Sequence, residues 1–109
     1  MEILFGDAKL RELCEQQRAA ERAFGKAPAR RLRARFADLQ AASCVTDLAA
    51  GHPHPLKGDR AGQLAIELAG GRRLVIEPAP GLAARNLGGS VAWAQVTAVR
   101  IVFIGDYHD

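Results

Sequence analysis

The sequence predicts an α+β domain in which helices pack on one face of a mainly antiparallel sheet. Two observations predict this fold class. Apolar residues recur at helical spacing through roughly the first half of the chain, and they alternate with polar residues in the second half. Helices followed by a run of strands, here in the order β-α-α-β-β-β, are typical of this architecture. We therefore expect the sheet face opposite the helices to be free to host a site.

The first half is predicted to form one strand and two helices. Residues 1–5 are short and apolar, and Asp7 suits the N-cap of a helix that runs to about Phe24 and ends at Gly25. Pro28 suits the first turn of the second helix. The inward-facing residues of that helix are expected to be Leu32, Phe36 and Leu39.

The second half is predicted to form three strands. Residues 63–68 place Leu64, Ile66 and Leu68 on one face, and residues 72–77 place Leu74 and Ile76 on one face. The two segments flank Gly70-Gly71, which is a hairpin signal. A last strand over residues 96–104 is apolar on both faces apart from one arginine, as expected of a central strand. Residues 51–55 and 78–90 are rich in turn-forming residues and are expected to be loops.

Length and composition fit one globular domain inside the cell. A chain of 109 residues is long enough for one domain and too short for two, and its 49% hydrophobic residues exclude disorder. Cys14 and Cys44 lack the spacing of a disulfide framework, so we expect reduced thiols. The sequence has neither an apolar run of membrane-spanning length nor a signal-peptide layout, so a cytoplasmic location is expected.

The region from residue 18 to residue 35 is strongly basic. It holds seven cations against one acid, in a chain whose net charge is +3. The arginines of the second helix avoid its apolar stripe and are expected to face solvent. This pattern has two interpretations, a solvated helix face or a surface that contacts nucleic-acid phosphates. The residues expected to contact phosphates are Arg30, Arg31, Arg33 and Arg35.

Two further segments carry groups capable of chemistry. One is the polar run from His54 to Arg60, which on its own would be a surface turn. The other is the chain end, where Asp106, Tyr107 and His108 follow the last strand without a linker. No metal site is expected, because His52 and His54 have no partners at the usual zinc-ligand spacing.

Four short motifs give these segments a family resemblance. They follow the order and pattern LKGDR-x-GQ, RL-(apolar)₂-EP, W-x-x-VT-x-(apolar)-x-I and a terminal DYH, and they occupy residues 56–63, 73–78, 93–101 and 106–108. This combination resembles the HigB-type toxins, the "killer" proteins of plasmid maintenance in the RelE/ParE superfamily. The resemblance covers nearly all of residues 1–109 and implies a single RelE-like domain.

The resemblance implies an activity and a set of partners. Such a toxin belongs to a type II toxin-antitoxin system and is an endoribonuclease that cuts messenger RNA in the ribosomal decoding site. The RNA 2′-hydroxyl attacks the adjacent phosphate, and no cofactor is implied. The implied partners are a small helix-turn-helix antitoxin, the ribosome with its 16S rRNA, and messenger RNA. Operator DNA is reached only through the antitoxin, and no membrane is involved.

The same resemblance assigns expected roles to six residues. His108 is the best candidate for proton transfer, and Asp106 either orients it or carries a second proton. Lys57 and Arg73 are expected to bind the phosphate and stabilise the transition state. Two residues keep alternative roles: Tyr107 stacks on a base or holds the 2′-hydroxyl, and His54 assists proton transfer or caps its loop. Which histidine is the base and which the acid is left open.

Two alternative functions come from other classes. ParE-type relatives are expected to share the fold but to inhibit DNA gyrase without cutting RNA. A plain nucleic-acid-binding module would keep the basic helix and make the C-terminal residues dispensable. The terminal Asp-Tyr-His cluster, together with Lys57 and Arg73, favours the nuclease, because a pure binder needs no groups for proton transfer.

Overall fold

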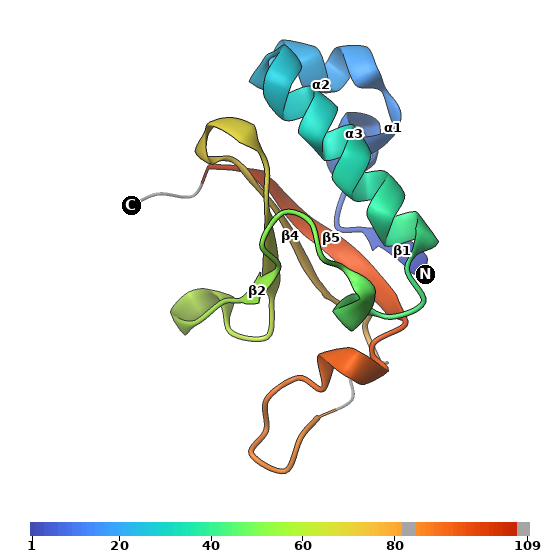
Figure 1. The fold of residues 1–109 in the computed structure, drawn as a ribbon, viewed down its shortest axis with the longest axis vertical. Coiled ribbons are helices and arrows are strands. Elements are labelled where there is room, and N and C mark those ends of the chain that lie inside the picture. The colour runs from blue at the N-terminus through green and yellow to red at the C-terminus, as the bar shows by residue number, and fades with distance from the viewer. Residues whose placement is uncertain (82–84, 107–109) are drawn as a thin grey trace.

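The computed structural model describes residues 1–81 and 85–106, which form a five-stranded sheet with three α-helices (Figure 1). The α+β class predicted from the sequence is confirmed. In chain order, the elements are β1 (Glu2–Phe5), α1 (Ala8–Glu15), α2 (Gln17–Phe24), α3 (Lys26–Ala41), β2 (His54–Pro55), β3 (Leu64–Glu67), β4 (Arg73–Pro78) and β5 (Ala98–Gly105).

The sheet is antiparallel except at one edge. Its strand order is β1-β5-β4-β3-β2, and β1 runs parallel to β5. The last strand therefore lies between β1 and β4, as its apolar sequence predicted. The predicted hairpin at Gly70-Gly71 joins β3 to β4, and both glycines have positive φ, at 70° and 77°. Glycine adopts this conformation without the steric penalty that other residues meet.

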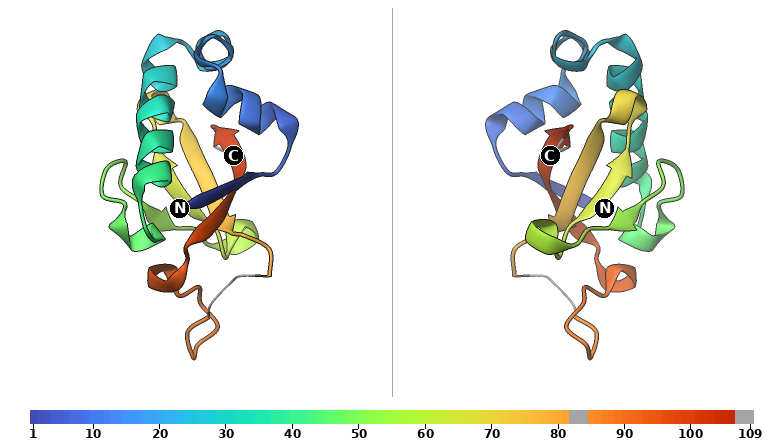
Figure 2. Two further views of the ribbon diagram at one scale, coloured as in Figure 1. Left: turned by 90° about the vertical axis from the view of Figure 1, so that its right-hand side faces the viewer. Right: turned by 90° about the vertical axis from the view of Figure 1, so that its left-hand side faces the viewer.

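Helices α1 and α3 pack on one face of the sheet, and α2 packs along α3 (Figure 2). The core lies between these layers. The predicted stripe of α3 contributes Leu32 and Leu39, which are at most 1% exposed, and Phe36 packs against the core's edge. The sheet contributes the alternate residues whose side chains share the helix-covered face: Leu64, Ile66, Leu74, Ile76 and Ile101.

The single helix predicted from Asp7 to Phe24 is wrong, because the chain forms two helices there. Asp7 does cap the first, with its carboxylate accepting a hydrogen bond of 2.8 Å from the Leu10 amide. The break falls at Gln16, whose extended backbone (φ −116°, ψ 103°) interrupts the helix. The break lets α1 pack on the sheet while α2 packs along α3. Neither Gly nor Pro marks this position, so the sequence carried no signal for it.

The loop predicted over residues 51–55 is also partly wrong. His54 and Pro55 form a short edge strand whose Cα partners are Ala65 and Leu64 of β3. The turn before this strand is tight. Gly51 has φ +84°, His52 has φ +49°, and the Glu67 amide donates a hydrogen bond of 2.6 Å to the Gly51 carbonyl. The sheet therefore fixes the backbone of this histidine-containing segment.

Gly51 is expected to be intolerant of a side chain. A Cβ at this position would lie 2.5 Å from the Cγ2 of buried Ile66, and the positive φ adds strain. We expect Gly51→Ala to lower the free energy of unfolding by about 2–4 kcal/mol. Urea unfolding measures this change. Gly58→Ala is the matched control, since Gly58 also has positive φ (+63°) but open space around its Cα. Equal losses in the two variants would contradict the steric explanation.

Both cysteines are free thiols, as expected from their spacing. Burial of its side chain, with a smaller contribution from the charge of Glu15, raises the pKa of the Cys14 thiol to about 12. A thiol with that pKa stays protonated at neutral pH and is a poor nucleophile or metal ligand.

Candidate functional site

The sheet face opposite the helices carries the polar side chains of β2, β3 and β4. Direct partners across a sheet share a face, and the register pairs His54 with Ala65, and Glu67 with Arg73. Arg73 in turn pairs with Gly105, the last residue of β5. The ends of three strands therefore bring a histidine, a carboxylate and a guanidinium to one region of this face.

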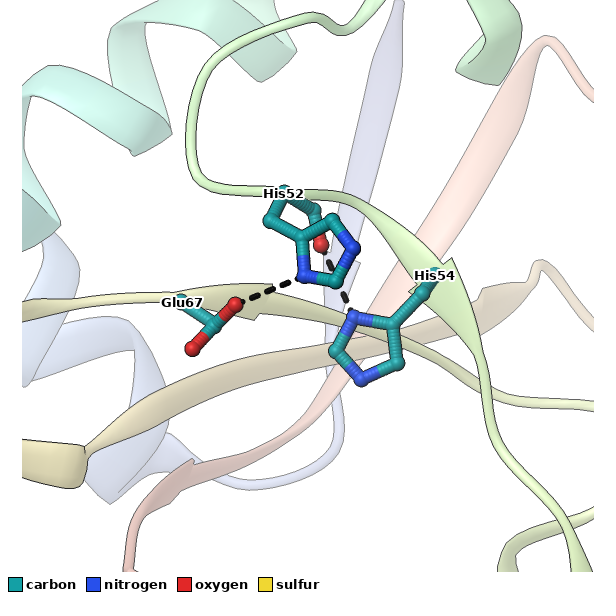
Figure 3. Close-up of side chains that lie close together, drawn as sticks. All are labelled: His52, His54 and Glu67. Carbon is teal, nitrogen blue, oxygen red and sulfur yellow. Dashed lines mark hydrogen bonds and ion pairs between the residues drawn. The ribbon is translucent and has the colours of Figure 1, made fainter.

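His52, His54 and Glu67 form a cluster in this region (Figure 3). The Nδ1 atom of His52 lies 2.8 Å from a carboxylate oxygen of Glu67, and the Nδ1 atom of His54 lies 2.8 Å from the His52 carbonyl oxygen. The two imidazole rings stack, with centroids 4.9 Å apart and planes inclined by 28°. A carbonyl oxygen only accepts, so Nδ1 of His54 carries the proton and Nε2 of the neutral ring has a free lone pair.

Glu67 is the negative charge of the cluster. Its hydrogen bond with His52 is the main cause that lowers the pKa of the Glu67 carboxyl below its usual range, and the charges of His52, Arg73 and His54 act in the same direction. The carboxylate therefore stays ionised down to a lower pH than an isolated glutamate. An ionised partner on one ring nitrogen holds His52 in a fixed orientation.

Arg73 lies at the start of β4, next to this cluster. Its guanidinium donates a hydrogen bond of 3.1 Å to the Gly71 carbonyl. Asp106 is exposed and follows Gly105, the strand partner of Arg73. Gly105 has φ +150°, where a side chain is disfavoured and a Cβ would lie 3.3 Å from the Phe103 ring. Tyr107 and His108, which were predicted to complete the site, lie outside the described residues.

Lys57 lies two residues after the end of β2 and directly precedes the single-turn helix Gly58–Arg60, and it is exposed. The same segment covers part of the sheet. The guanidinium of Arg60 lies 4.7 Å from the centroid of the Phe103 ring, and the strand partners Ala65 and Val75 are fully buried. This face, which was expected to be free to host a site, is therefore free only in part. The region around His54, Glu67 and Arg73 is where its polar groups gather.

The other end of this face is occupied by an ion pair. Arg100 of β5 donates to Glu77 of β4, its strand partner, through Nε at 3.0 Å and also through a terminal nitrogen. Gln63 extends this network to Arg60, with a hydrogen bond of 3.0 Å from the Arg60 guanidinium. These residues satisfy one another, so we assign them a structural role.

The basic face of α3 is smaller than predicted. Arg30, Arg31 and Arg33 are exposed, as expected. Arg35 was expected on the same face, but its side chain is only 16% exposed and its Nε lies 3.0 Å from Asp38. Arg35 follows Leu32 by three residues and precedes Leu39 by four, so helical spacing places it on the packing side. On that side, the Arg35 Cδ lies close to Gly51: a Cβ added at Gly51 would be 3.2 Å from it.

Two members of the cluster were missed at the sequence level. His52 was considered only as a metal ligand, and Glu67 was assigned to the polar face of a strand without a role. The association of Glu67 with His54 depends on the pairing of β2 with β3, whereas residues 51–55 were predicted to be a loop. The strained turn at Gly51 and His52, which places His52 next to Glu67, also has no signal in the sequence.

Comparison with solved structures supports the fold independently of the sequence patterns. No protein-family model matches the sequence, and no curated protein matches it. A search of solved structures finds a YoeB/ParE toxin from Agrobacterium tumefaciens, with a TM-score of 0.59 over 99% of this chain and 100% of that chain.

The chain has the fold of a YoeB/ParE toxin. The sequence identity is 12%, so the likeness concerns the toxin fold alone. This confirms the RelE-like fold that the resemblance in four short motifs implies. Within the described ranges, none of the helices of this toxin fold has the length and apolarity to cross a membrane.

Proposed function

We propose that the chain is the toxin of a type II toxin-antitoxin system, and that it cuts messenger RNA in the ribosomal decoding site. The proposal depends on one observation. The sheet register places His54 and Arg73 in one region of the face opposite the helices. Gly105, the strand partner of Arg73, ends β5 there, and Asp106 follows it directly. Proton carriers and a cation at one place are what RNA cleavage by a 2′-hydroxyl requires.

The proposed reaction needs a base, an acid and cations that stabilise negative charge. A base removes the proton of the 2′-hydroxyl as it attacks the adjacent phosphate, and an acid protonates the departing 5′-oxygen. His54 and His108 are the two candidates for these roles. Arg73 and Lys57 bind the phosphate oxygens and stabilise the negative charge of the phosphorane. Asp106 orients His108 or carries a second proton, and Tyr107 stacks on a base or holds the 2′-hydroxyl.

The proposed partners follow from the same assignment. A cognate antitoxin, a small helix-turn-helix protein, holds the toxin silent and provides its contact with operator DNA. The ribosome positions the message against the site, which lowers the entropic cost of alignment. The exposed Arg30, Arg31 and Arg33 are proposed to contact phosphates of the 16S rRNA.

Induced expression of the toxin without its antitoxin tests this function in cells. We expect growth to stop and translated messages to acquire new 5′ ends inside their reading frames, which primer extension detects. Plasmid supercoiling, measured in the same cells, is expected to stay normal. Growth arrest with intact messages and altered supercoiling would instead indicate a ParE-like gyrase inhibitor.

The basic helix gives a separate prediction about ribosome binding. Replacing Arg30, Arg31 and Arg33 together with Gln is expected to weaken sedimentation with ribosomes and to reduce the salt slope of binding by about one for each phosphate that is no longer neutralised. Folding stability should change little, because exposed charges contribute little to it. Arg35→Gln is the matched control, since its largely buried side chain should affect stability more than the salt slope. Unchanged binding by the triple variant would make this face a solvated surface.

A further inference from the structure

We propose that His52, His54 and Glu67 form a binding site for a transition-metal ion of the zinc class. Each of the three residues offers one ligand atom, and these atoms lie within 4.8 Å of one another (Figure 3). The set consists of two imidazole nitrogens and one carboxylate oxygen. Imidazole suits Zn²⁺, Cu²⁺ and Ni²⁺, whereas Mg²⁺ and Ca²⁺ prefer oxygen ligands alone.

The backbone holds the three ligands in place without the metal. Glu67 ends β3, and His54 is fixed by its strand pairing with Ala65. His52 is fixed by the hydrogen bond between the Gly51 carbonyl and the Glu67 amide, at 2.6 Å. The positive φ of His52 is unusual for a residue with a side chain, and such strain is concentrated at functional sites. With the backbone held in this way, side-chain rotations bring the three ligand atoms around one ion.

The hydrogen bonds of the cluster also prepare it for a metal. Nδ1 of His54 donates to a backbone carbonyl, a contact typical of metal-binding histidines because it fixes the tautomer and leaves the Nε2 lone pair for the ion. Nδ1 of His52 lies 2.8 Å from the Glu67 carboxylate, and an ion bound by both groups takes the place of the proton between them. The exposed side chain of His52 leaves the solvent side of the ion open for water or another ligand.

The sequence pattern could not indicate this site. A histidine pair separated by one residue lacks the usual zinc-ligand spacing, and the third ligand comes from another strand. Because His54 is also proposed to carry a proton during cleavage, a bound ion and the reaction would compete for one imidazole. That competition rests on the proposed function, but the metal site itself does not.

Titration of the purified, chelator-treated chain with Zn²⁺ against a chromophoric chelator tests the site. We expect one ion per chain, and we expect His52→Ala and Glu67→Gln each to weaken binding by about 10–100-fold. Glu12→Gln, which removes an exposed carboxylate on α1, is the matched control and should bind as the parent does. A Cys44→Ser background removes a partly exposed thiol, and the raised pKa of Cys14 keeps the other thiol protonated.

A second measurement keeps the test decisive if a variant fails to fold. Paramagnetic Cu²⁺ added to the ¹⁵N-labelled parent chain should first broaden the amide signals of Gly51, His52, His54 and residues 66–68. Unchanged Zn²⁺ affinity in His52→Ala and Glu67→Gln, or broadening centred elsewhere, would overturn the site. Since neither readout involves RNA, failure here leaves the proposed nuclease function standing.

Discussion

Replacing His108 with Gln is expected to slow single-turnover cleavage of ribosome-bound messenger RNA by about 10²–10⁴-fold, the usual contribution of general acid–base catalysis. Glutamine keeps hydrogen-bonding groups but cannot take up or release a proton near neutral pH. Affinity for the ribosome should stay close to that of the parent, because the exposed arginines of α3 are proposed to supply the attraction. Cleavage is measured by quench flow, and affinity by sedimentation.

The control for His108→Gln is Asp109→Asn, which changes the neighbouring residue and should leave the rate unaltered. His54→Gln, measured beside them, addresses the question left open between the two histidines. If His108 is dispensable and His54 is not, proton transfer belongs to the described cluster. Full cleavage by both histidine variants would exclude an essential role for either of these two imidazoles.

Replacing Arg73 with Gln is expected to lower the cleavage rate by about 10²–10³-fold, the cost of losing one charged group that stabilises a transition-state oxyanion. The guanidinium lies at the first residue of β4, close enough to Glu67 to lower its pKa. Single-turnover rates at saturating ribosome concentration isolate this chemical effect from binding. Arg73→Lys should recover part of the rate, since it restores charge but not bidentate contact.

Arg72→Gln is the matched control for Arg73→Gln. Arg72 precedes Arg73, and its guanidinium lies 5.7 Å from the centroid of the Phe24 ring. Its replacement should therefore affect packing rather than cleavage. Urea unfolding of both variants separates the two effects. Equal rate losses in Arg72→Gln and Arg73→Gln would attribute the defect to the hairpin and contradict a specific role for Arg73.

Most of the fold could be predicted because local patterns agreed with the tertiary structure. The stripe of α3 is buried at Leu32 and Leu39, and the apolar residues expected on one face of β3 and β4 are buried too. Burial of Ala65 and Val75 on the other face was not indicated by the alternation. The break at Gln16 and the edge strand at His54 could not be predicted in this way. Both depend on contacts with distant elements, α1 with the sheet and β2 with β3, and neither has a distinctive composition.

The positions of candidate-site residues could be predicted where these residues lie in a strand or directly after one. Arg73 lies at the start of β4 and Asp106 directly after β5, as the strand pattern indicated. Arg35 was predicted to face solvent because of its charge, although its spacing from Leu32 and Leu39 places it on the packing side of α3. Glu67 and His52 were missed because their association depends on sheet register and on a strained turn, which no short motif encodes.

Cleavage of one end-labelled message, free and bound in a programmed ribosome, is the decisive measurement for the proposed nuclease. We expect the purified protein to cut the ribosome-bound message at sites in the reading frame and to cut the free RNA poorly, because only the ribosome aligns the 2′-hydroxyl with its phosphate. Efficient cutting of free RNA would contradict ribosome dependence. An intact message in both samples, with gyrase supercoiling inhibited by the same preparation, would contradict the nuclease itself.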